Sequence, residues 1–192
     1  MSNKMNNKTN KIKYIFISSG TQKVLDYLVN QNNWKIAKEI QRNISLSKAG
    51  VNLSLNKLLK LGLIKKEQKG KTYLYRVNSS SIIKQFKVLE NVIGCFSLTE
   101  KLKLVSQKII LFGSASRGEN LPNSDIDLFV VTHNPEEVKK IIEKDKLKDK
   151  LQPIIRSPLE YTNLEKKDPV FYQEIERGII LWEKEEHYAD EI

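Results

Sequence analysis

Two short apolar runs, separated by a polar segment that contains glycine, constrain this chain more than any other feature. Residues 109–112 and 128–131 are rich in Ile, Leu, Phe and Val, and turn-forming residues flank both runs. Such runs are typical of buried strands. The segment between them begins at Gly113 and ends with Asp-Ile-Asp at 125–127. We therefore expect two strands joined by a polar loop that carries a short helix.

Asp125 and Asp127 bring paired carboxylates to the start of the second run. Alternate residues of a strand point to the same face, about 6.5–7 Å apart along the chain, so both carboxylates are expected to face one place. Ionised carboxylates that close repel each other unless a cation lies between them. Because Mg²⁺ prefers oxygen ligands, the pair predicts a site for Mg²⁺ or Mn²⁺. The alternative is a turn and cap at a strand edge, where Asp-x-Asp is also common.

Gly113 and Ser114, at the end of the first run, favour a negatively charged ligand. Glycine after a strand lets the backbone approach a ligand closely, and the amide groups that open a following helical turn attract anions. Ser114 adds a hydroxyl, and Arg117 is close enough in sequence to contact phosphate. Gly-Ser is also common in ordinary loops, so this prediction depends on its combination with the two aspartates.

This combination resembles the signature of the DNA polymerase beta-like nucleotidyltransferase superfamily, and most closely its minimal prokaryotic members. The signature is a strand, Gly-Ser, ten residues and Asp-x-Asp on the next strand, and the chain matches it without gaps. The resemblance implies transfer of a nucleoside monophosphate from a nucleoside triphosphate to an acceptor, with release of pyrophosphate. It assigns catalysis and a divalent metal, Mg²⁺ or Mn²⁺, to Asp125 and Asp127, and nucleotide binding to Gly113, Ser114, Arg117 and Ser124.

The later strand departs from the superfamily pattern, which usually places a third carboxylate there. The strand expected at 152–156 carries none on either face. Ile154 is predicted to be the position that best lines up with the missing carboxylate, and Asp149 and Glu160 are expected to be surface residues. We therefore expect ordinary nucleotide binding, with transfer that is slow or depends on a partner.

Charge is distributed unevenly along the chain, whose net charge is +10. Residues 1–80 hold 16 Lys and Arg against 3 Asp and Glu, whereas residues 81–192 hold 17 against 20. A compositional bias of the genome would act on both halves, so the basic N-terminal half indicates a nucleic-acid partner.

The N-terminal half is predicted to form three helices and a hairpin. Residues 21–30, 34–44 and 47–61 have apolar residues at helical spacing. Residues 63–77 alternate like a β-hairpin and turn at Gly70. Three helices followed by a basic hairpin resemble a winged helix-turn-helix domain, and therefore imply binding to double-stranded DNA. A winged helix that serves dimerisation or protein contact is the alternative.

The winged-helix resemblance also assigns roles to individual residues. It places the third helix in the major groove and the wing against the phosphate backbone. The implied DNA-binding residues are Ser47, Lys48 and Asn52, which face the bases, and Lys69 and Lys71 on the wing.

The expected fold class is α+β, with a winged helix-turn-helix followed by a small mixed-sheet nucleotidyltransferase domain. After the two central strands we expect a helix at 136–147, the strand at 152–156, a helix at 168–177 and a final strand at 179–182. A helix at 79–93, ended by Gly94, precedes another at 98–107. The predicted organisation is a disordered arm at 1–13, the winged helix at 14–78, a linker helix at 79–97 and the nucleotidyltransferase domain at 98–192.

Other sequence features bear on the cellular location and the oligomeric state of the protein. No apolar run approaches the roughly 18 residues of a membrane span, and the N-terminus lacks the pattern of a signal peptide. The single cysteine, Cys95, suits a reducing cytoplasm, and His133 and His187 have no ligand spacing. We expect a cytoplasmic protein without membrane contact that forms a homodimer if the helix at 79–93 pairs.

Three functional hypotheses follow from these patterns. The chain is a DNA-binding regulator that modifies a protein or small-molecule acceptor, a repressor that only senses nucleotide, or an antitoxin-like protein that binds a toxin-like partner. Turnover distinguishes the first from the second, and a copurifying partner identifies the third.

Overall fold

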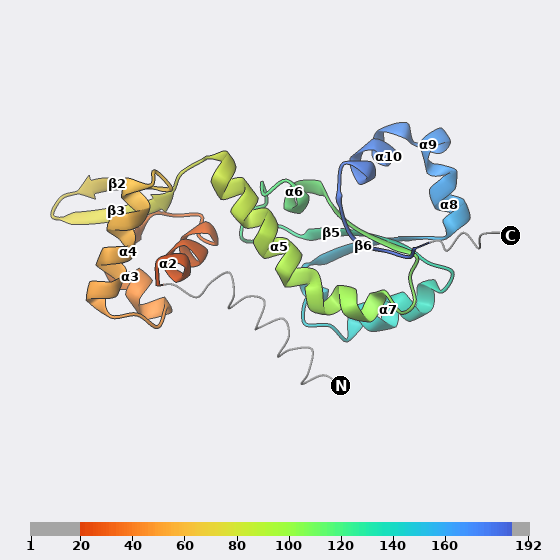
Figure 1. Cartoon of the computed structure of the whole chain (residues 1–192), viewed down its shortest axis with the longest axis horizontal. Coiled ribbons are helices and arrows are strands. Elements are labelled where there is room, and N and C mark those ends of the chain that lie inside the picture. Colours follow the sequence, from red (N-terminus) through yellow and green to blue (C-terminus); the bar gives the residue numbers. More distant parts are fainter. Residues whose placement is uncertain (1–19, 186–192) are drawn as a thin grey trace, which may run out of the picture. The chain divides into compact units, whose positions relative to one another are not determined.

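The computed structural model describes residues 20–185, which form the α+β architecture expected from the sequence (Figure 1). The chain divides into two compact units. The N-terminal unit contains described residues up to Ile93 together with Gly118–Asn123, and the C-terminal unit contains 94–117 and 124–185. The arm expected at 1–13 and His187 lie outside the described residues.

The N-terminal unit packs three helices against a small antiparallel sheet (Figure 1). In the sheet, β3 (Thr72–Val77) lies between β1 (Lys35–Ile36) and β2 (Ile64–Lys69). The helices are α2 (Gly20–Val29), α3 (Ala37–Asn43) and α4 (Lys48–Lys60).

The predicted apolar stripe of α4 is confirmed. Val51, Leu55 and Leu58 are each 1% exposed and pack in the core of the unit. Ser47 caps α4 by accepting a hydrogen bond from the amide of Gly50, at 3.1 Å. The second predicted helix begins later than expected, at Ala37, because Lys35 and Ile36 pair with β3 instead.

Helix α5 (Ser81–Leu102) runs through Gly94 without interruption, so the predicted break is wrong. A glycine inside a helix costs only about 1 kcal/mol relative to alanine. Buried neighbours on both sides of it, Ile93, Cys95 and Leu98, offset that cost. The helix expected at 98–107 is the end of α5, which stops at Leu102.

A loop that belongs to the N-terminal unit, Gly118–Asn123, is held against the first half of α5. Lys84 forms an ion pair of 2.6 Å with Glu119. Lys87 donates to the carbonyl oxygen of Asn120, whose side chain also bonds Asn91. This loop lies in sequence between the Gly-Ser and Asp-x-Asp elements.

The C-terminal unit is built on a mixed sheet, as the sequence predicts, and the order of its four strands is β6-β5-β4-β7 (Figure 1). Strand β4 (Lys108–Phe112) is antiparallel to β5 (Ile126–Val131) and to β7 (Ile179–Glu183), whereas β6 (Leu151–Arg156) is parallel to β5. The helical segments are α6 (Gly113–Ser116), α7 (Pro135–Glu143), η1 (Lys148–Lys150), α8 (Pro158–Thr162), α9 (Leu164–Lys167) and α10 (Pro169–Glu176). Helix α7 ends four residues before its predicted end at 147.

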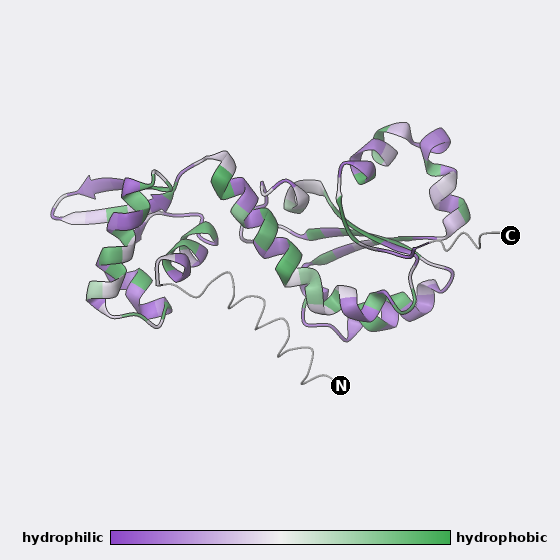
Figure 2. Ribbon diagram, in the orientation of Figure 1, coloured by the Kyte–Doolittle hydropathy of each residue, from purple (hydrophilic) through white to green (hydrophobic). Residues whose placement is uncertain are grey.

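The two faces of this sheet bury different apolar clusters, and the strands are accordingly hydrophobic in Figure 2. Leu128 and Val130 face the end of α5 and α7. Phe129 and Val131 face the side that packs with Ile175 of α10. Because alternate residues share a face, Asp127 projects on the α10 side. Among the described helices, none is long and apolar enough to cross a membrane.

An ion pair between a partly exposed lysine and a buried carboxylate fixes the end of α5 to the loop after α7. Lys101 Nζ lies 2.5 Å from Asp145 Oδ2, and the Asp145 side chain is only 2% exposed. The other carboxylate oxygen of Asp145 accepts a hydrogen bond from the amide of Leu147. A carboxylate this deeply buried depends on its partners for compensation.

Replacing Lys101 with Met is expected to lower the free energy of unfolding by about 3 kcal/mol, because Asp145 loses its charged partner. Urea unfolding in a Trp34→Phe background measures it, since Trp182 on β7 is then the remaining tryptophan. Lys103→Met, which removes the pair with the more exposed carboxylate of Glu100, is the control and should cost less than about 1 kcal/mol. Equal losses in the two variants would contradict the assignment.

Candidate functional site

The two predicted metal ligands lie at the start of β5, at one edge of the C-terminal sheet. Asp127 pairs in register with Phe112 of β4 on one side and with Gln152 of β6 on the other. It is half-buried, whereas Asp125 is exposed. The alternation of the strand directs the Asp127 carboxylate to the α10 side of the sheet. Asp125 immediately precedes β5, and its carboxylate lies beside Gln152, the residue that pairs with Asp127.

Gly113 lies directly against the Asp127 carboxylate. A Cβ atom added to Gly113 would lie 2.2 Å from Asp127 Oδ2 and 3.0 Å from its Cγ, and the residue has a φ of +66°. Both facts require glycine, because a side chain would clash and L-residues rarely adopt this conformation. Because β4 ends beside the start of β5, the turn at Gly113 places backbone atoms that carry no side chain next to the Asp127 carboxylate.

The short helix α6 that follows this turn carries the other residues of the Gly-Ser element. Ser114 is half-buried, and Ser116 donates through its hydroxyl to the carbonyl oxygen of Gly113, at 2.9 Å. Arg117, which follows α6, is exposed and forms an ion pair of 3.2 Å with Glu174 of α10. Ser124 is half-buried and immediately precedes Asp125.

Burial and neighbouring charges raise the pKa of Asp127 above its ordinary value. Burial has the largest effect, followed by the negative charges of Asp125 and Glu174, while Arg117 acts in the opposite direction. Glu174 therefore contributes to the electrostatics of the site, although sequence analysis gave it no role. Only the packing of α10 against the sheet brings it there, and no local pattern signals that packing.

Gln152 is the second residue that sequence analysis missed. It stands opposite Asp127, and its side-chain amide donates to Asp125 Oδ2 at 2.6 Å. The prediction that Ile154 best lines up with a third carboxylate is wrong. Ile154 pairs with Phe129 and packs in the apolar cluster on that face, two residues further along the strand.

The donor set suits a hard divalent cation that shares its coordination with a ligand. Two carboxylates face one place, and Gly113 leaves open backbone beside them. Within residues 20–185, no group of three or more His, Cys, Asp or Glu side chains is placed to hold a metal. Cations with few protein ligands commonly complete their shell with water and substrate phosphate oxygens.

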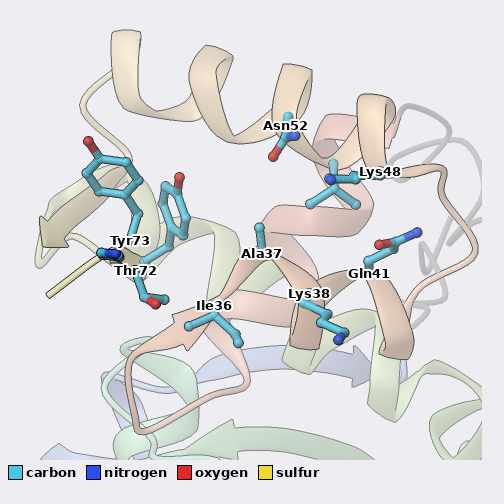
Figure 3. Close-up of a pocket in the computed structure, with 11 residues that line it drawn as sticks. Ile36, Ala37, Lys38, Gln41, Lys48, Asn52, Thr72 and Tyr73 are labelled. Atoms are coloured by element: carbon cyan, nitrogen blue, oxygen red, sulfur yellow. The ribbon is translucent and has the colours of Figure 1, made fainter. Parts of the chain in front are cut away.

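A separate hollow of about 640 Å³ lies in the N-terminal unit, between α3, α4 and β3 (Figure 3). Three of the residues predicted to bind DNA line it: Lys48, Asn52 and Lys71. Lys38 and Gln41 of α3 add polar groups that sequence analysis did not single out. The lining contains three lysines and no acidic residue, so the hollow is suited to an anion.

The two other predicted DNA-binding residues, Ser47 and Lys69, do not line this hollow. Both are exposed: Ser47 caps α4 just before Lys48, and Lys69 ends β2 at the hairpin turn.

Comparison with known proteins assigns part of the chain to a domain family. Residues 97–181, fewer than half of the chain, match the family model of the nucleotidyltransferase domain. One similar solved structure is that of a candidate nucleotidyltransferase from Sulfolobus solfataricus. It is 19% identical, with a TM-score of 0.33, over 51% of this chain and 88% of that protein. A search of curated proteins gives no significant match. Residues 97–181 therefore carry a nucleotidyltransferase domain, and no family is assigned to the N-terminal unit.

Asp127→Asn is expected to raise the melting temperature of the metal-free protein near pH 7. Because folding raises the pKa of this carboxyl above 3.8, the folded state binds its proton more tightly than the unfolded chain does. The Asp127 carboxyl therefore contributes its full stabilisation at pH values below its pKa in the unfolded chain. This stabilisation is lost as the pH rises through its pKa in the folded state. The gain in melting temperature should disappear near pH 3, where the side chain at position 127 is neutral in both wild type and variant.

Calorimetric melting in EDTA at the two pH values measures this effect. Asp149→Asn, which removes an exposed carboxylate from the same unit, is the matched control. A gain for Asp127→Asn that is the same at both pH values would contradict the electrostatic explanation.

Proposed function

We propose that residues 97–181 bind a nucleoside triphosphate with Mg²⁺ or Mn²⁺ and transfer its nucleoside monophosphate to an acceptor, with release of pyrophosphate. The observation that carries this proposal is the contact between the Gly113 backbone and Asp127, with the Asp125 carboxylate close enough to raise the pKa of Asp127. A phosphate chain at the turn would meet both carboxylates through a shared cation.

The residues of the site have distinct roles in this proposal. Gly113 and Ser114 hold the triphosphate through the backbone and the Ser114 hydroxyl, and Ser124 supports the start of β5. Asp125 and Asp127 hold the cation, which would neutralise phosphate charge and align the reacting groups. Arg117 contacts phosphate, and its exposed pairing with Glu174 is weak enough to be exchanged for it.

Transfer is expected to be slow or to require a partner. Gln152, opposite Asp127, cannot accept a proton from an attacking hydroxyl as a carboxylate does. Loss of a general base typically costs about 10²–10⁴ in rate and leaves ground-state binding in place. Two alternatives share the same site: a nucleotide sensor that does not turn over, and an antitoxin-like protein whose partner completes it.

The N-terminal unit supports a second proposed function, sequence-specific binding to double-stranded DNA. Its three helices and antiparallel hairpin resemble a winged helix-turn-helix domain. Lys48 and Asn52 on α4 and Lys71 on the wing share one hollow, which joins the proposed base-reading helix to the proposed phosphate contact. Together the two functions describe a cytoplasmic DNA-binding regulator, dimeric if α5 pairs with a second copy.

Nucleotide binding is expected to require both a divalent cation and the two aspartates. Asp125→Asn combined with Asp127→Asn should abolish the calorimetric signal of a nucleoside triphosphate with Mg²⁺, because the cation loses its charged protein ligands. Wild type in EDTA should behave the same way.

Glu136→Gln with Glu137→Gln is the matched control for that experiment. It also removes two carboxylates, but from the first turn of α7, beyond the opposite end of β5. Unchanged wild-type binding in EDTA would contradict the two-carboxylate site.

DNA binding is expected to weaken steeply with salt, with a logarithmic slope of about −0.9 per phosphate contact. Lys69→Ala with Lys71→Ala should weaken binding to all sequences, whereas Asn52→Ala should relax sequence preference. Fluorescence anisotropy with a selected and a scrambled duplex, across a salt series, separates these effects.

Lys146→Ala with Lys148→Ala provides the charge-matched control, since both lysines are exposed in the C-terminal unit. Equal affinity at low and high salt, or an equal effect of the control pair, would rule out the proposed interface.

A further inference from the structure

Gln152 lies next to both proposed metal ligands of the C-terminal site. Parallel pairing sets it opposite Asp127, so its side chain emerges on the same face as the two carboxylates. Its amide nitrogen lies 2.6 Å from Asp125 Oδ2. The residue therefore touches one proposed metal ligand and stands beside the other.

The chemistry of an amide differs from that of a carboxylate at this position. The NH₂ group of Gln152 donates to Asp125, and its carbonyl oxygen is a neutral acceptor. Asp125 is exposed, so without this bond its side chain would be free to change rotamer. A charge-assisted hydrogen bond of this kind is stronger than one between neutral groups and fixes the direction of the carboxylate.

The charge of the site has a direct consequence for cation number. Among the protein ligands, Asp125 and Asp127 together carry two negative charges, which match one divalent cation. Glu174 and Arg117, which lie 3.2 Å apart, carry opposite charges and together add no net charge to the site. Two cations about 3.5–4 Å apart repel each other and need additional anionic ligands between or beside them.

We propose that Gln152 makes this a one-cation site by orienting Asp125 through its amide and by withholding the charge that a second cation requires. This inference rests on the proposed function, in which the site binds a nucleoside triphosphate with a divalent cation. Gln152 acts through Asp125 and is a positioning residue. The single cation is the one that accompanies the triphosphate, and the acceptor side of the site stays uncharged.

The test compares wild type with Gln152→Ala and Gln152→Glu in titrations of Mn²⁺ alone, followed by the electron paramagnetic resonance of free Mn²⁺. Gln152→Ala should weaken Mn²⁺ binding about 10-fold, as loss of a residue that orients a ligand typically does. Gln152→Glu should bind Mn²⁺ more tightly than wild type, because it adds a carboxylate. Since Gln152 is exposed, the melting temperatures of the variants should match that of wild type.

A second titration repeats the series with adenosine 5′-(α,β-methylene)triphosphate, which cannot transfer its nucleotide. Wild type and Gln152→Ala should then bind one Mn²⁺ per chain, and Gln152→Glu should bind two. Gln107→Glu is the matched control: it makes the same substitution beside Val131, at the opposite end of the β4–β5 pair, and should resemble wild type.

Two outcomes would overturn the inference: equal Mn²⁺ affinity in wild type, Gln152→Ala and Gln152→Glu, or two Mn²⁺ per chain in wild type. Failure of the proposed function has a different signature. If wild type bound Mn²⁺ but not the nucleotide analogue, the proposed function would fail, while the order of Mn²⁺ affinities would still decide the role of Gln152. Absence of any Mn²⁺ binding by wild type would overturn both.

Discussion

The antiparallel pairing of β4 with β5 is the interaction on which the C-terminal site depends. It sets Phe112 opposite Asp127, so the chain turns at Gly113 beside the carboxylate that begins the next strand. Because the sheet buries Leu111, Leu128 and Phe129 almost completely, a slip of this register would move the apolar side chains to the wrong face. The hydrophobic core thereby fixes the positions of Gly113 and Asp127 at the edge of the sheet.

Much of this arrangement could be predicted from short-range patterns. Apolar runs bounded by glycine and polar residues indicated β4 and β5, and the i, i+4, i+7 stripe of Val51, Leu55 and Leu58 indicated α4. The pairing of Asp125 with Asp127 followed from the two-residue period of a strand. These features are local, so the sequence alone carries enough information to place them.

The features that sequence analysis missed depend on contacts between distant segments. Gln152 lies 27 residues from Asp125, and the parallel register of β5 with β6 decides that it, and not Ile154, faces the carboxylates. Glu174 reaches the site only because α10 packs on that face of the sheet. The break predicted at Gly94 is wrong for the opposite reason, since burial of the neighbouring helical residues outweighs the local preference of glycine.

The loop Gly118–Asn123 also bears on how this protein can be divided into fragments. The chain leaves the C-terminal unit after Arg117 and re-enters it at Ser124, and the excursion is anchored to Lys84, Lys87 and Asn91. A fragment cut at residue 97, where the family match begins, would keep the Gly-Ser and Asp-x-Asp motifs but lose these anchors. A fragment that begins at Ser81, the start of α5, keeps them, so the segment that holds this loop in place extends beyond the matched domain.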